Sequence, residues 1–168
     1  MYTLLHTASY NGQVDTMRWL LNHGADANSY SSGGFTPLNE AACEMQLEAV
    51  QVLFDHHADI NSQDRTGRTS LYWILSHCGS KKKFVYMVQL LLKLGVNPNI
   101  CTTENHRAPL HEASSQGLLE ATRLLLSHEA KVDEKDKWGN TPFQLAASGG
   151  HEELTKLLVE HGAVPPSQ

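Results

Sequence analysis

The sequence predicts an all-α protein, a solenoid of five stacked helix–turn–helix repeats. The first observation is a recurring phrase, most regular as Thr36-Pro37-Leu38-Asn39, whose last residue falls at positions 6, 39, 72, 111 and 144. Its spacings are therefore 33, 33, 39 and 33 residues. The second observation is a leucine-rich segment that follows every copy of the phrase. A constant period of this length predicts one domain, 1–168, with repeats at about 1–30, 31–63, 64–102, 103–135 and 136–168.

The first helix of each repeat is expected to begin at this phrase. Thr36 can cap the helix by accepting a bond from a backbone N–H, and Pro37 suits the first helical position because its missing donor costs nothing there. Leu38 and Ala41 then give a small apolar face, so that a neighbouring helix can approach closely. Ala108 replaces the capping threonine in the fourth repeat, which should cost about 1 kcal/mol.

A second helix follows a break near Met45. Its apolar residues run from Leu47 to Phe54 with helical spacing. In three repeats a glycine suited to a left-handed conformation stands just past the end of this helix, namely Gly24, Gly95 and Gly162. His57 and Glu129 take that place in the second and fourth repeats, which should cost roughly 1 kcal/mol of strain or force a different cap.

The third repeat is longer than the others. Five residues are inserted around Cys78 to Lys83, between its two helices, and they include Lys81-Lys82-Lys83. One more residue is added between Thr102 and His106. Five plus one accounts for the spacing of 39 residues.

These repeats resemble the ankyrin repeat family. The resemblance rests on Gly34 to Ala42 and Gly139 to Ala147, which match the Gly-x-Thr-Pro-Leu-His-x-Ala-Ala pattern, and on Gly24 to Asn28 and His57 to Asn61, which match the closing Gly-Ala-Asp-Val-Asn. It covers nearly the whole chain in five copies. It implies helix–turn–helix units that are joined by β-hairpin-like fingers and stacked into a curved slab, with a concave surface made by the fingers and the first helices.

Composition excludes several classes of function. The formal net charge of −5 argues against nucleic-acid binding, and Lys81-Lys82-Lys83 is most simply a solvated run. No signal peptide and no apolar stretch long enough to cross a bilayer is present. Three widely spaced cysteines suit a reducing compartment. We therefore expect a protein of the cytoplasm or nucleus, without membrane insertion.

Ten histidines invite a metal or catalytic interpretation, but most occupy fixed positions in the repeats. His6 and His111 end the phrase, where the family resemblance implies hydrogen bonds between neighbouring fingers. Four others follow second helices and suit helix C-termini, namely His23, His56, His128 and His161. Zinc motifs, a nucleophile with an adjacent base and a phosphate-binding glycine loop are absent. We therefore expect no enzyme, no cofactor and no metal; the alternative, an enzyme or ligand binder, would need a polar pocket with a perturbed titratable group.

The favoured function is a protein-interaction module, acting as an adaptor, inhibitor or substrate-recruiting subunit, with another protein or peptide as its partner and most simply a monomer. Finger and first-helix positions that the fold does not dictate are free to select that partner. The candidates are Tyr10, Tyr30, Phe35, Glu44, Arg65, Arg68, Trp73, His77, Arg107, Gln116 and Trp138. Aromatic residues with arginines are typical of binding hot spots, and we expect a mixed-charge groove for an extended or helical segment. In the alternative, Trp73 and Trp138 pack sideways against neighbouring repeats.

Two further expectations stay open. Asn28, Asn61 and Asn99 each stand eight residues after a leucine, as Asp133 does, and the family includes substrates of an oxygen-dependent asparagine hydroxylase. By resemblance these four positions are candidates for hydroxylation, although asparagine also stabilises turns. At the N-terminal end Tyr2 and Trp19 leave the stack poorly covered, so a partner segment or preceding residues could lie there.

Overall fold

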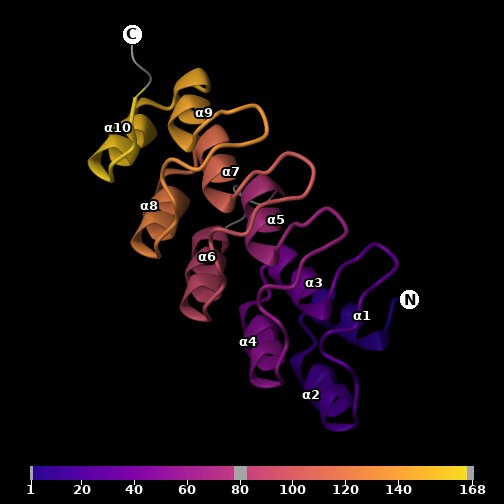
Figure 1. Cartoon of the computed structure of the whole chain (residues 1–168). Helices are drawn as coiled ribbons and strands as arrows, with labels where there is room; N and C mark the ends of the chain where they lie inside the picture. Colours follow the sequence, from indigo (N-terminus) through magenta and orange to yellow (C-terminus); the bar gives the residue numbers. More distant parts are fainter. Residues whose placement is uncertain (1, 78–82, 166–168) are drawn as a thin grey trace.

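The computed structural model describes residues 2–77 and 83–165, which form ten α-helices arranged as five antiparallel pairs (Figure 1). The first helix of each pair is short. These are α1 (Leu4–Tyr10), α3 (Pro37–Cys43), α5 (Ser70–His77), α7 (Pro109–Ser115) and α9 (Pro142–Ser148). The second helices are α2 (Val14–Asn22), α4 (Leu47–Asp55), α6 (Phe84–Lys93), α8 (Leu119–Ser127) and α10 (Glu152–Glu160).

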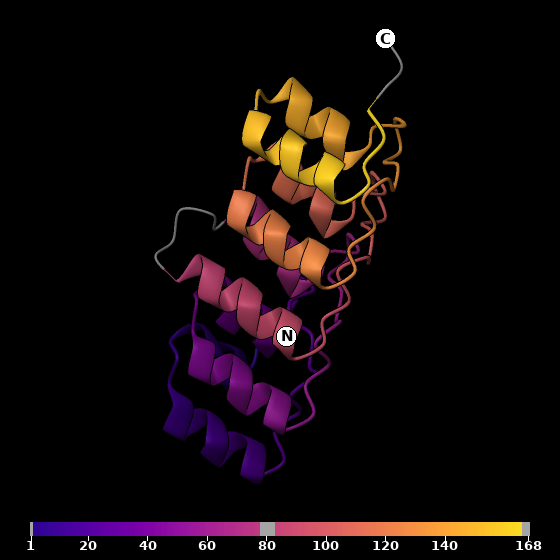
Figure 2. The same cartoon turned by 90° about the vertical axis from the view of Figure 1, so that its left-hand side faces the viewer.

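The pairs stack in one direction, with the termini at opposite ends (Figure 1). Seen from the side, the second helices lie roughly parallel in one row, and the loops between pairs project along one edge (Figure 2). Every substantial contact between helices joins two helices of one pair or of adjacent pairs. The expected all-α solenoid is confirmed. The only pairing of strand type within the described residues is an isolated bridge between Gln63 and Thr69.

The helices begin where the sequence predicts. Thr36 caps α3: its hydroxyl accepts a hydrogen bond from the Asn39 N–H, and Pro37 occupies the first turn. Ala108 has no side-chain acceptor and leaves α7 without this bond. Met45 ends the first helix of its pair with a φ of 56°.

Left-handed residues end most of the second helices, as the sequence predicts. Gly24 has a φ of 86°, while His57 and Glu129 adopt 62° and 64° at the same place. The latter two therefore carry the strain that a side chain brings to this region. The expected insertion between α5 and α6 falls largely on 78–82, outside the described residues.

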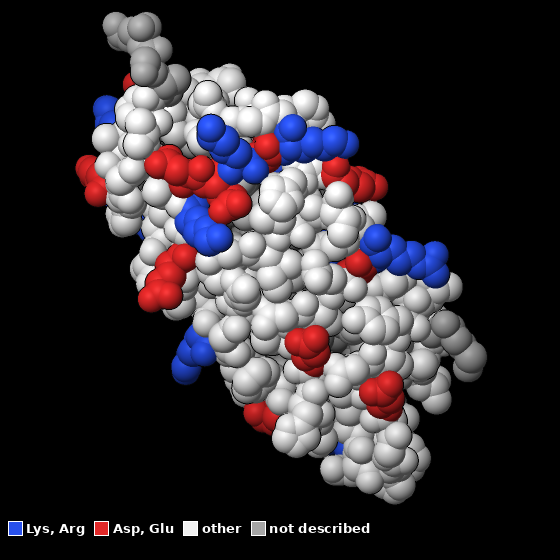
Figure 3. All heavy atoms as spheres, viewed as in Figure 1, with Lys and Arg blue, Asp and Glu red and all other residues white. Residues whose placement is uncertain are grey.

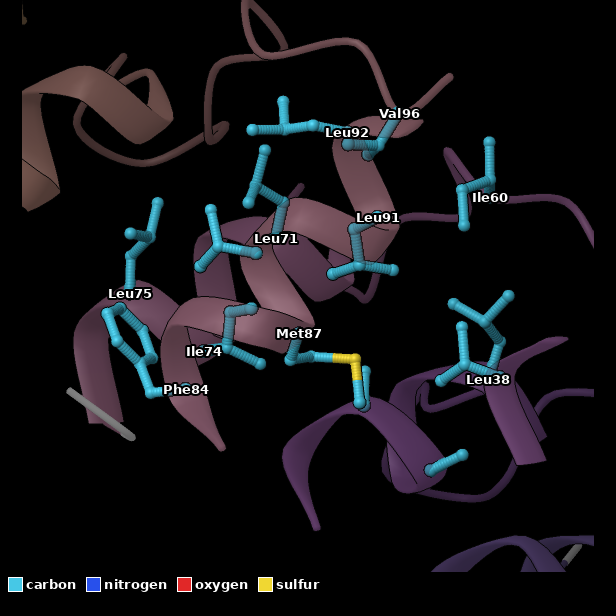
Figure 4. Packing of buried hydrophobic residues seen from close by; sticks show 14 of the residues in the cluster. Leu38, Ile60, Leu71, Ile74, Leu75, Phe84, Met87, Leu91, Leu92 and Val96 are labelled. Atoms are coloured by element: carbon cyan, nitrogen blue, oxygen red, sulfur yellow. The ribbon is translucent and has the colours of Figure 1, made fainter. Parts of the chain in front are cut away.

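The core is a continuous apolar layer between the two rows of helices. In the third pair, Leu71 and Ile74 of α5 meet Met87 and Leu91 of α6, all fully buried, and Leu38 of the preceding pair adjoins them (Figure 4). Each pair thus shares its core with its neighbours. Because this packing holds the pairs rigidly, the loops between them are displayed at fixed intervals along one edge.

Candidate functional site

The loops between pairs are built around two acidic residues. Asp64 Oδ1 accepts hydrogen bonds from the backbone N–H of Thr66 at 2.8 Å and of Arg68 at 2.9 Å, and Oδ2 accepts one from Trp73 Nε1 at 2.7 Å. Burial alone would raise the pKa of Asp64, but these bonds together lower it. The Asp64 carboxylate therefore fixes both the loop and the Trp73 indole.

Asp136 repeats this arrangement in the last loop. Its Oδ1 accepts from the backbone N–H of Trp138 at 3.0 Å and of Asn140 at 2.9 Å. Its Oδ2 lies 3.2 Å from Arg107 Nε. Burial opposes ionisation, yet the hydrogen bonds lower the pKa of this carboxyl.

Four of the predicted binding residues come together beside α5. The Phe35 and Trp73 rings lie 5.0 Å apart, the His77 ring stacks 4.5 Å from Trp73, and Arg68 Cζ lies 5.1 Å from the centre of the indole. We call Phe35, Arg68, Trp73 and His77 the aromatic cluster. Trp73 is half-buried against Phe35 of the preceding loop, so the alternative of sideways packing holds for this tryptophan in part.

Trp138 stands apart from that cluster. It is 64 % exposed, and Arg107 Cζ from the preceding loop lies 5.6 Å from the centre of its ring. Between the two sites, Tyr72 donates a hydrogen bond to Glu112 at 3.1 Å, and Gln116 donates to the other carboxylate oxygen at 3.1 Å. Burial, reinforced by Glu112, raises the pKa of the Tyr72 phenol strongly. These bonds fix Tyr72 of α5, over whose ring Arg68 Cζ lies at 6.0 Å, to Glu112 of α7.

The remaining candidates do not join these contacts. Tyr10, Tyr30 and Arg65 are exposed and Glu44 is half-buried. Within the described residues, neither Tyr10 nor Tyr30 contacts another aromatic ring. Their part in binding stays a prediction.

Sequence reasoning missed the organising role of Asp64 and Asp136. Each is followed three residues later by a glycine with positive φ, Gly67 or Gly139. An aspartate that accepts bonds from the N–H groups of its own turn is a recognised turn former. That spacing is the signal that would have found them.

Five histidines have the structural roles expected for them. His111 does not: its Nδ1 accepts a bond from the Ala108 N–H at 3.2 Å, and its buried Nε2 has no hydrogen-bond partner among the described residues, so the expected bond to a neighbouring finger is not made. His6 Nε2 bonds to the Phe35 carbonyl of the next pair at 2.9 Å. Four others donate from Nδ1 to the carbonyl four residues earlier, at 2.7 to 2.9 Å; they are His23, His56, His128 and His161. No group of three potential metal ligands occurs among the described residues. In the same part of the chain, no helix has the length and apolar character needed to cross a bilayer.

The asparagines at the base of the loops tie successive pairs together. Asn28 accepts a bond from the Asp59 N–H at 2.7 Å and donates to the His57 carbonyl at 3.0 Å. Asn61 accepts from the Asn97 N–H at 2.7 Å, and Asn99 bonds to the backbone of Glu129 and Lys131 in the same way as Asn28. Asp133 accepts a bond from the Val164 N–H at 3.2 Å. These side chains form a ladder along the stack.

Hydroxylation at Asn28, Asn61, Asn99 and Asp133 stays a prediction. Because the ladder engages these side chains, an enzyme would have to open the loop to reach them. Treatment with an oxygen-dependent asparagine hydroxylase, followed by mass spectrometry of the peptides, would show the mass of one added oxygen. Peptides of unchanged mass would remove this possibility.

Comparison with known proteins identifies the architecture. A family model described as "Ankyrin repeats (3 copies)" matches residues 1–64 and 75–168. The chain is 30 % identical to cyclin-dependent kinase 4 inhibitor B of Rattus norvegicus over 154 residues, which cover 92 % of this chain and 88 % of the relative. It is 32 % identical to the putative ankyrin repeat protein FPV024 of fowlpox virus over 140 residues.

Other matches are more local. The chain is 44 % identical to the potassium channel GORK of Arabidopsis thaliana over 68 residues, and it spans only 8 % of that channel. It spans 17 % of the fowlpox virus protein. Since the family model covers both halves of the molecule and every helix pair obeys the same plan, the chain belongs to the ankyrin repeat family of protein-interaction modules.

Proposed function

We propose that this protein binds a partner protein through the concave surface formed by its loops and first helices, and that it acts without chemistry of its own, as an inhibitor, adaptor or recruiting subunit. The observation that carries the proposal is the aromatic cluster. It spans two loops and α5, and Asp64 holds its tryptophan in place. A preorganised aromatic surface beside arginines is the composition that dominates binding energies at protein interfaces.

Charged residues are distributed unevenly along the stack. In the face seen in Figure 3, nearly all Lys and Arg lie over the half that contains α5–α10, where Asp and Glu are interspersed with them, while the charged residues near α1–α4 are mainly Asp and Glu. Arg18 is the only basic residue before Arg65 in the sequence, with lysine and arginine counted. A mixed-charge surface favours one orientation of the partner over the reverse.

A kinase domain is the first partner to consider. The relative that aligns along 92 % of this chain is named for inhibition of cyclin-dependent kinase 4. Occlusion of a kinase by a rigid concave surface needs no catalytic residue. Such a role also places the protein inside the cell.

Two substitutions test the surface with purified cyclin-dependent kinase 4 as the probe. We expect Trp138→Ala and Arg68→Ala each to weaken binding by at least tenfold, about 1.4 kcal/mol, in isothermal titration calorimetry. Trp138 is well suited because its side chain is mostly exposed, so its loss should leave the fold intact. Trp73 is less suited because its indole also stabilises the Asp64 loop.

Tyr86→Ala is the matched control. Tyr86 is as exposed as Trp138 but lies on the second helix α6, away from the concave side. Its removal should leave the affinity unchanged. No binding of the kinase by the wild type would reject this partner; equal affinities of all three variants and the wild type would reject this surface.

A further inference from the structure

The outer side of the first helix pair is built as an interface between repeats. Leu4 is 75 % exposed, whereas the equivalent positions in the other four pairs are all buried; they are Pro37, Ser70, Pro109 and Pro142. Trp19 is 59 % exposed, whereas its equivalent Val52 is fully buried. Leu20 is only half-buried, and its equivalent Leu53 has no exposed surface. We call the surface of Tyr2, Leu4, Trp19 and Leu20 the N-terminal face.

Backbone groups on the N-terminal face match those that bond across the other junctions. His57 O and Asp59 N bond to Asn28 of the preceding pair, and the equivalent atoms of the first pair are Gly24 O and Asp26 N. Within the described residues, neither of these atoms has a hydrogen-bond partner. The first pair therefore presents a donor and an acceptor in the same register as the two groups that Asn28 bonds at the next junction.

The acceptor of a second hydrogen bond between pairs is also present on the N-terminal face. Phe35 O accepts a bond from His6 Nε2 of the preceding pair. The equivalent atom on the N-terminal face is Tyr2 O, which accepts no hydrogen bond in the described part of the chain. Between these groups lies a hollow of about 390 Å³, lined mainly by apolar side chains that include Leu4, Leu5, Leu20 and Ala25.

The opposite end of the stack is finished differently. The helix α10 exposes charged residues, Glu152, Glu153, Lys156 and Glu160. In sequence register the asparagine position of the last repeat is a proline, Pro166. Polar outer surfaces are what terminal repeats need for solubility. The C-terminal end of a second copy therefore offers a charged surface on α10 and lacks the asparagine that the N-terminal face would require.

We propose that the N-terminal face docks an ankyrin-type repeat of another polypeptide, stacked in register as a further step of the solenoid. The argument is continuity with the interfaces already present between the five pairs. The partner repeat carries an asparagine at the base of its loop, which bonds Gly24 O and Asp26 N. It also carries a histidine or glutamine at the end of its first-helix phrase, directed at Tyr2 O, and an apolar surface that covers Leu4 and Trp19. This surface is separate from the concave one and independent of the proposed kinase binding.

The probe is a designed array of consensus ankyrin repeats from which the C-terminal capping repeat has been deleted, so that its last repeat presents such an asparagine. We expect a one-to-one complex with the full chain in sedimentation velocity and isothermal titration calorimetry. Leu4→Glu should weaken it by at least tenfold, because a carboxylate would be buried against apolar side chains. Replacement of the last asparagine of the probe by alanine should also weaken it, which tests the register.

Val159→Glu is the matched control, since Val159 is an exposed apolar residue of α10 at the other end of the stack. It should bind the probe like the wild type, and thermal melts should show both variants folded. Absence of a complex, or equal weakening by Leu4→Glu and Val159→Glu, would overturn the proposal. Self-association of the wild type that Leu4→Glu abolishes would overturn it as well, because the occupant would then be a second copy.

Discussion

Replacement of Asp64 by alanine is expected to lower the free energy of unfolding by about 3 kcal/mol. The carboxylate accepts bonds from two backbone N–H groups, from the Thr66 hydroxyl at 2.7 Å and from the Trp73 indole. Truncation would leave these donors without their acceptor in a partly buried loop. The effect should extend to the next loop, because Thr103 N donates to Thr66 O at 3.0 Å. Urea titration followed by circular dichroism measures the change.

Asp59→Ala provides the comparison within the same molecule. The Asp59 carboxylate is exposed and accepts one hydrogen bond from the Asn61 N–H at 2.9 Å. We expect its loss to cost no more than about 1 kcal/mol. If the two alanine variants were equally stable, the Asp64 carboxylate would not organise the loop.

The same carboxyl makes stability depend on pH. Its pKa is lower in the folded state than the unfolded value of about 3.9. Its contribution is therefore complete above that value and is lost as the pH falls through the folded pKa. Asp136 acts in the same direction. Glu40, whose pKa burial raises, acts in the opposite direction. Asp64→Asn should accordingly flatten the decline in stability below about pH 4, relative to the wild type.

The second largest change in the free energy of unfolding is expected from substitutions in the fourth helix pair, α7 and α8, that restore a helix cap and remove a strained side chain. Ala108→Thr with Glu129→Gly is expected to raise the free energy of unfolding by about 2 kcal/mol. The first substitution restores a cap acceptor that Thr36 and Thr141 provide in other pairs. The second relieves a side chain held at a φ of 64°. Ala108 stands at the start of α7 and Glu129 just past the end of α8, so the two effects should add.

Buried polar atoms make this pair weaker still. Ser114 Oγ and Thr122 Oγ1 are buried and have no hydrogen-bond partner among the described residues. At the position equivalent to Ser114, Ser9 Oγ donates to the Leu5 carbonyl at 2.7 Å. An unpaired buried hydroxyl costs roughly 1–3 kcal/mol. The fourth pair thus has several local features that lower its stability.

Hydrogen exchange can locate this weakness. Amides of α7 and α8 should exchange at least tenfold faster than those of α3 and α4 in the wild type. The double variant should narrow that difference, and Thr36→Ala, the reverse change in the second pair, should weaken its own pair instead. Uniform exchange along the array, with no gain from the repair, would show that junction contacts outweigh these local defects.

Much of the fold follows from one phrase. Thr36, Pro37 and Leu38 combine a cap, a first-turn proline and a core residue, and copies of this phrase start α3, α7 and α9 with few changes. Local signals of this kind act within a few residues, so they can be found without knowledge of the tertiary structure. The left-handed His57 and Glu129 were predictable for the same reason, because register with Gly24 reveals them.

The contacts of the aromatic cluster could not be predicted from local sequence signals in the same way. Phe35, Trp73 and His77 could be assigned to one face from their register, but their mutual contact depends on how tightly two adjacent pairs approach. The bond between Tyr72 and Glu112 joins residues 40 positions apart. It depends on the distance between α5 and α7, which no local pattern specifies.

The ladder of asparagines, together with the restriction of helix contacts to neighbours, has a mechanical consequence. Tension applied at the two ends would pass through every junction in series, since each substantial helix contact in the described part of the chain joins helices of one pair or of adjacent pairs. The extension would therefore be stepwise. The junction with the weakest hydrogen bonds would separate first, while the remaining helix pairs stayed stacked.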